Sequence, residues 1–171
     1  MLCTAKRDMY LWHVICPSGV NIGRAGACSR RFFSKQRLSF EVLGGMNMTI
    51  SEALEKLSKS KFRGGFHLKK KDFDYIEKVG LDKIREHACD FVRARLAPAY
   101  IANDGAQTPT RGHPIFIAQH ACACCCRGCL NKWYRVPKNT EISTQGQAKI
   151  VNLLMAWIEK ELESRRGSKA E

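Results

Sequence analysis

The chain has 171 residues, and its 29 Lys and Arg against 16 Asp and Glu give it a formal net charge of +13. That length is typical of a single domain, and a hydrophobic content of 44% excludes a wholly disordered chain. The longest apolar run, residues 150–158, is interrupted by Asn152 and is too short to span a bilayer. We therefore expect a protein that does not cross a membrane.

Residues 1–47 differ in composition from the rest of the chain. They hold seven Lys and Arg against two Asp and Glu, and they show no sustained hydrophobic period. They also lack the charged start, apolar stretch and cleavage site of a secretory signal. We predict a basic leader, either disordered or an over-extended start, with an organelle transit peptide as the alternative. A helical core domain over residues 48–163 and a frayed tail over residues 164–171 should follow.

Apolar residues at helical spacing predict three helices in the first half of the core, over residues 49–59, 72–79 and 81–96. Thr49 or Ser51 can cap the first helix, and Gly80 closes the second. A basic loop with a Gly-Gly break lies between these two helices, and a proline stops the third.

In the second half, residues 103–114 form a loop by composition, and residues 115–134 begin as a helix that leads into a cysteine cluster. Thr144 and Gln147 have the spacing of a capping box for the last helix. The predicted fold class is mainly α: a small single-domain core of four to five helices with an irregular central loop and a Cys/His cluster.

Five of the nine cysteines lie between Cys122 and Cys129. This crowding is not typical of a secreted disulfide framework, so we expect a reduced, cytoplasmic protein. Cys126 and Cys129 form a CxxC, whose spacing lets two thiolates bind one ion, and zinc takes four nitrogen or sulfur ligands. The sequence therefore predicts a zinc site. Its predicted ligands are Cys126, Cys129 and His120, with one more from Cys125, His113 or His87.

Two other interpretations of the cysteines stay open. They could be small buried residues that pack against the core. Alternatively, Cys125, Cys126 and Cys129 could be the thiols of a redox protein.

The loop at 103–114 contains several groups able to act on a substrate. Asp104 could be a base, Arg111 an anion-binding group and His113 a proton carrier. These residues would serve a metal-dependent, hydrolase-like enzyme. The alternative is a turn-rich connection whose side chains satisfy their own backbone. The chain has no P-loop, HExxH or GxSxG motif.

Basic residues and two aromatic residues, Phe62 and Phe66, alternate in the segment 61–71. Such a segment offers charges for phosphate and rings for stacking, which predicts nucleic acid or another anionic ligand as a partner. Charge runs are also common on faces that only contact solvent. The candidate nucleic-acid-binding residues are Arg63, Lys69, Lys70, Lys71 and Lys132.

Several longer segments resemble the small bacterial family catalogued as domain of unknown function 4186, over about residues 60–163. They are FHLKKKD (66–72), IREHACDFVRARLAP (84–98), NDGAQTPTRGHPIFIAQHA (103–121), CCRGCLNKW (125–133) and MAWIEKEL (155–162). The residues that match the family are His87, Asp104, Arg111, His113, Gln119, His120, Cys125, Cys126 and Cys129. The family has threonines at Cys122 and Cys124, so the resemblance implies that these two thiols are not essential. It implies no activity.

Overall fold

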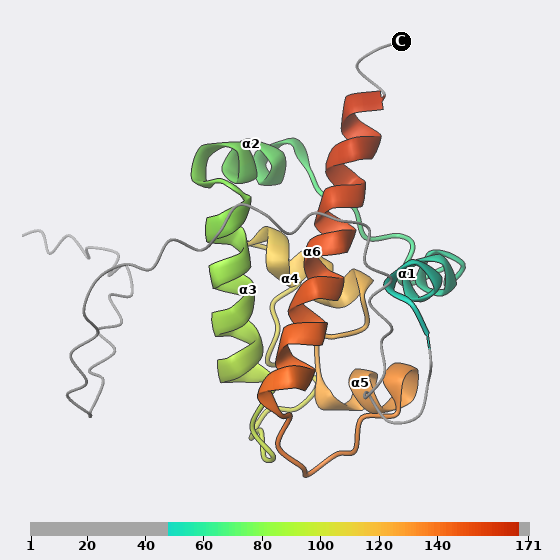
Figure 1. Ribbon diagram of the computed structural model, residues 1–171, viewed down its shortest axis with the longest axis vertical. Coiled ribbons are helices and arrows are strands. Elements are labelled where there is room, and N and C mark those ends of the chain that lie inside the picture. The colour runs from blue at the N-terminus through green and yellow to red at the C-terminus, as the bar shows by residue number, and fades with distance from the viewer. Residues whose placement is uncertain (1–47, 168–171) are drawn as a thin grey trace, which may run out of the picture. The chain divides into compact units, whose positions relative to one another are not determined.

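The computed structural model describes residues 48–167, and the predicted leader at 1–47 lies outside the described residues. Six helices are present in this part of the chain (Figure 1), one more than the sequence led us to expect, and the prediction of a mainly helical fold is confirmed. They are α1 (Ile50–Ser58), α2 (Lys70–Val79), α3 (Leu81–Arg95), α4 (Pro114–Ala121), α5 (Arg127–Tyr134) and α6 (Thr144–Gly167).

Local signals set the ends of the first three helices. Thr49 caps α1: its hydroxyl accepts a hydrogen bond from the Glu52 backbone N–H at 3.2 Å, while the Glu52 carboxylate accepts one from the Thr49 N–H at 2.6 Å. Gly80 separates α2 from α3 with φ at 84°, a conformation that disfavours residues with a Cβ. The chain therefore turns sharply between two helices without a longer loop.

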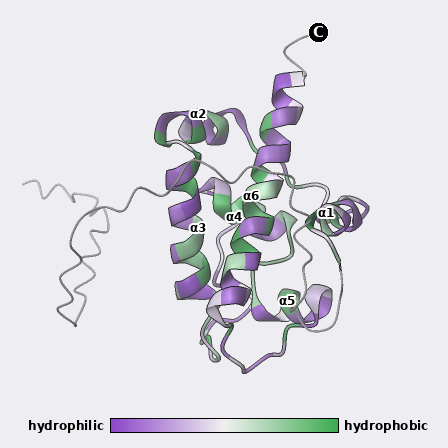
Figure 2. Ribbon diagram, viewed as in Figure 1, coloured by the Kyte–Doolittle hydropathy of each residue, from purple (hydrophilic) through white to green (hydrophobic). Residues whose placement is uncertain are grey.

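The core lies where α6 packs against α3, α4 and α1, while α2 contacts α3 and α4. Figure 1 shows α3 and α6 running side by side, with α4 next to them. Ile84, Ala88 and Val92 recur at four-residue spacing on α3 and are fully buried, as are Leu154 and Ile158 on α6. Figure 2 shows hydrophilic residues along the outer turns of α3 and over the C-terminal part of α6.

Two details of the second half differ from the sequence prediction. The segment 115–134 forms two short helices, α4 and α5, because the chain turns at Ala123, where φ is 54°. The predicted capping box of Thr144 and Gln147 is wrong, since Thr144 is already inside α6. Ser143 caps the helix instead, and its hydroxyl accepts a hydrogen bond from the Gly146 N–H at 3.2 Å. Among the described residues, no helix has the length and apolarity to cross a membrane.

Candidate metal centre

Three thiols meet where α5 begins. Cys126 is the N-cap of α5, and its Sγ accepts a hydrogen bond from the Cys129 backbone N–H at 3.3 Å. The CxxC therefore wraps the first turn of the helix, where backbone N–H groups favour negative charge on sulfur. Cys125 precedes this cap, and its Sγ lies 3.5 Å from that of Cys129. The Sγ atoms of all three lie within 4.8 Å of one another.

The thiols are largely shielded from solvent. Cys125 and Cys126 are each 7% exposed, and Cys129 is half-buried. In the described part of the chain, no fourth Cys, His, Asp or Glu joins this group. The cluster thus offers three sulfur ligands to a single metal ion.

A buried arginine from a distant segment closes the cluster. Arg63, in the connection between α1 and α2, is 8% exposed. Its guanidinium donates to the backbone carbonyl of His120 at 2.6 Å and to the Sγ of Cys129 at 3.1 Å, with the Sγ of Cys125 at 3.8 Å. A cation among three thiols favours their ionised form. The sequence placed Arg63 among the candidate nucleic-acid-binding residues, but in the structure its side chain is buried against the cysteine sulfurs.

The position of Arg63 depends on the glycine that follows it. A Cβ on Gly64 would lie 2.5 Å from the backbone oxygen of Ser58 and 3.2 Å from that of Ser60. Only glycine permits this close approach of the two backbone segments. The tight turn after α1 therefore aims Arg63 at the cysteines.

Hydrogen bonding and burial shift the pKa values of the three thiols in different directions. The hydrogen bond between Cys129 and Cys125 lowers the pKa of Cys125, and Arg63 lowers it further, against the opposing effect of burial. The same hydrogen bond, together with burial, raises the pKa of Cys129. Burial raises the pKa of Cys126. Cys125 is therefore the thiol that ionises first.

His120, the predicted histidine ligand, lies beside the cluster without joining it. Its Nε2 is 3.2 Å from the carbonyl oxygen of Thr108, and its ring stacks on Phe66 with centroids 5.4 Å apart. The Thr108 hydroxyl donates to the carbonyl of Cys125 at 2.8 Å. His120 and Thr108 thus support the backbone that carries the thiols.

The structure brings His87 to His113 and not to the cysteines. The Ile115 N–H donates to Nδ1 of His113 at 3.1 Å, so this nitrogen carries no proton. Nε2 of neutral His113 then donates to Nδ1 of His87 at 3.0 Å. Burial, and then the neighbouring His87, lower the pKa of His113 to about 4. The hydrogen bond between the two rings joins α3 to the start of α4.

The three residues proposed for catalysis make separate contacts. Asp104 accepts a hydrogen bond from the Arg127 backbone N–H at 2.8 Å, at the start of α5. His113 caps α4, and the exposed Arg111 lines a cavity with residues of the 65–72 segment. The three side chains therefore lie in different settings, and the contacts described for them do not bring them together in one catalytic arrangement.

Arg127 has a structural role that the sequence did not indicate. Its buried guanidinium donates to the carbonyls of Leu96 at 3.1 Å, Pro137 at 2.6 Å and Thr140. It therefore ties the ends of α3 and α5 and the connection to α6 together. No local pattern could have found this, because its partners lie 10 to 31 residues away.

The remaining cysteines and lysines fall into two environments. Cys122 and Cys124 are fully buried in the core, and burial raises the pKa of each. This placement agrees with a packing role for both. The other predicted nucleic-acid-binding residues are exposed: Lys69, Lys70, Lys71 and Lys132.

A family model identifies this domain. The model described as "Domain of unknown function (DUF4186)" matches residues 51–159. The chain therefore belongs to this family, as its sequence motifs had indicated. No solved structure matches the chain.

Proposed function

We propose that the protein binds one zinc ion through the thiolates of Cys125, Cys126 and Cys129, with Arg63 as the hydrogen-bonding partner of the sulfurs. The observation that carries this proposal is the grouping of three Sγ atoms within 4.8 Å, on the hydrogen-bonded first turn of α5.

The spacing and charge of the cluster suit zinc. A tetrahedral ion with sulfur ligands at about 2.3 Å holds them roughly 3.8 Å apart. The separation of 3.5 Å between Cys125 and Cys129 is close to this value. Three thiolates and a divalent ion carry one net negative charge, which the buried Arg63 balances. The fourth ligand would be a water molecule or another small ligand, in a reducing, cytoplasmic setting.

Such an ion would hold together segments that are distant in sequence. The three sulfurs come from the α4–α5 junction and Arg63 from the α1–α2 connection. Because the unfolded chain does not hold the three thiolates in place, the binding free energy of the zinc adds to the stability of the fold. We therefore propose a structural role for the zinc.

One observation favours a second candidate, a thiol-redox function. Cys125 and Cys129 lie close enough to form a disulfide after a small movement, and the lowered pKa of Cys125 makes it the better nucleophile. The Cys125 thiolate would attack a partner disulfide, and Cys129 would then displace the partner thiol. Two electrons pass to that partner as the new disulfide forms.

Metal analysis of the purified full-length protein separates the two candidates. We expect about one zinc per chain, lost in Cys126→Ser and kept in Cys89→Ser, which removes an exposed cysteine on α3. Because Cys126→Ser could unfold the domain, chelation followed by zinc titration of the wild-type chain is the second measurement. Zinc should then protect three thiols from alkylation. A metal-free protein with a reversible Cys125–Cys129 disulfide would overturn the zinc proposal in favour of redox function.

A further inference from the structure

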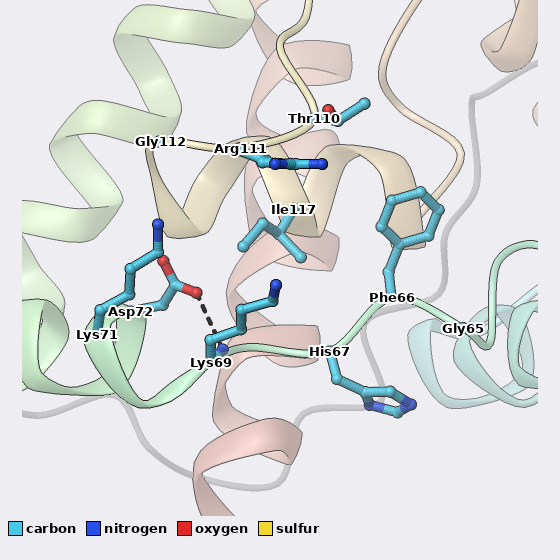
Figure 3. Close-up of a pocket in the computed structure, with 10 residues that line it drawn as sticks. All are labelled: Gly65, Phe66, His67, Lys69, Lys71, Asp72, Thr110, Arg111, Gly112 and Ile117. Atoms are coloured by element: carbon cyan, nitrogen blue, oxygen red, sulfur yellow. Dashed lines mark hydrogen bonds between the residues drawn. The ribbon is translucent and has the colours of Figure 1, made fainter.

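A cavity of about 270 Å³ lies between the 65–72 segment and the loop that precedes α4 (Figure 3). Phe66 and Ile117 form apolar parts of its wall. This volume lies just below the range of roughly 300–1,000 Å³ that is typical of small-molecule sites. The cavity therefore has room for part of a small organic ligand and not only for an ion.

Three cationic side chains border this cavity: Lys69, Lys71 and Arg111. All three are exposed. In Figure 3 the Arg111 and Lys69 side chains lie on opposite sides of Ile117, and the Lys71 side chain lies farther off, beside Asp72. Within residues 48–167 no ion pair involves any of them. They come from two separate segments, so the fold, and not only the sequence run, gathers the charge.

The carboxylate in the wall does not cancel this charge. Asp72 is 4% exposed, and its carboxylate accepts a hydrogen bond from the Lys69 backbone N–H at 2.9 Å in the first turn of α2. It therefore serves as an internal cap of the helix. Three cations face one carboxylate that already has a partner, which leaves the cavity positive.

We propose that this cavity binds the phosphate group of a nucleotide, with the organic part of the nucleotide against Phe66 and Ile117. A guanidinium and two ammonium groups suit the several oxygens of a phosphate better than the two of a carboxylate. An apolar wall next to them suits a sugar or base. The phosphate could belong to a free mononucleotide or to a single-stranded nucleic acid. The site does not depend on a metal at the thiols.

Calorimetric titration of the full chain with AMP, adenosine, inorganic phosphate and a short oligodeoxyadenylate tests this proposal. We expect AMP to bind more tightly than inorganic phosphate, because only AMP reaches the apolar wall, and adenosine to show no binding. If AMP binds more tightly than the oligonucleotide, the ligand is a free nucleotide. If the oligonucleotide binds more tightly, the ligand is a single strand of nucleic acid. No binding by either AMP or the strand would overturn the proposal.

Neighbouring lysines provide the matched control. Lys70 is exposed and lies between two residues that line the cavity, but it is not part of the lining. Lys71→Gln and Arg111→Gln should each weaken binding about tenfold, whereas Lys70→Gln should leave it nearly unchanged. These exposed variants should keep the melting temperature of the wild-type chain. Equal weakening by Lys70→Gln would show that only general charge attracts the ligand, and would refute a defined site.

Discussion

Replacement of the buried arginine tests its proposed action on the thiols. Arg63→Met keeps a long side chain in the tight turn and removes the charge beside Cys125 and Cys129. Arg63→Lys keeps the charge but loses the planar fork, which donates to both His120 and Cys129. The two variants therefore separate charge from hydrogen-bond geometry.

The size of the effect follows from the bonds that are lost. The carbonyl of His120 keeps a hydrogen bond from the Ala123 N–H at 3.3 Å, so it is not left without a donor. The main loss is the charge-assisted bond from Arg63 at 2.6 Å. Such a bond contributes about 1.5–3 kcal/mol. We expect the free energy of unfolding to fall by about 2 kcal/mol in Arg63→Met, and by less in Arg63→Lys.

Alkylation of the metal-free protein reports on the charge. Without Arg63 the pKa of Cys125 should rise, since one of the groups that lowers it is gone. The rate of reaction with iodoacetamide near neutral pH should therefore fall in Arg63→Met and less in Arg63→Lys. Arg93→Met, at an exposed ion pair with Asp90, is the control. Identical rates and stabilities in Arg63→Met and Arg93→Met would refute the role of Arg63.

Three further predictions concern other parts of the fold. Gly64→Ala should lower the free energy of unfolding by roughly 2 kcal/mol or more, as measured by urea denaturation. Gly65→Ala, whose Cβ would meet no atom closer than 3.5 Å, should leave it nearly unchanged. Because the folded pKa of His113 is about 4, below its usual 6.5, its contribution to stability is complete above pH 6.5 and is lost as pH falls toward 4. In His113→Asn the free energy of unfolding should no longer fall between pH 6.5 and pH 4. If it falls as in the wild-type chain, His113 is not the group that causes this pH dependence. Finally, Cys122→Thr and Cys124→Thr should keep the zinc stoichiometry of the wild-type chain, and loss of zinc in either would show that these thiols take part.

The sequence alone predicted the helices well where local signals set their ends. Thr49, Gly80 and the stripe on α3 each depend on neighbours within a few residues, and the structure agrees with all three. The cap of α6 was placed one residue late, because Ser143 and Thr144 are both good caps and the pattern does not distinguish them. Local chemistry therefore placed the ends of the first three helices to within two residues.

The site was predicted only as far as its local spacing allows. The CxxC and Cys125 lie within one turn of each other, so their proximity could be read from the sequence. Arg63 lies 66 residues before Cys129, and no short-range pattern links them. The pairing of His87 with His113 also depends on how α3 meets α4. Contacts between distant segments are set by the packing of the whole core, which is why these partners were missed.

X-ray absorption at the zinc edge of the purified full-length protein tests the three-thiolate centre, because it reports the atoms bound to the metal. We expect three sulfur ligands at about 2.3 Å and one lighter ligand at about 2.0–2.1 Å. Any zinc that stays bound to Cys125→Ser should show only two sulfur ligands. A spectrum with two or fewer sulfurs in the wild-type chain, or one unchanged by Cys125→Ser, would contradict the proposed three-thiolate centre.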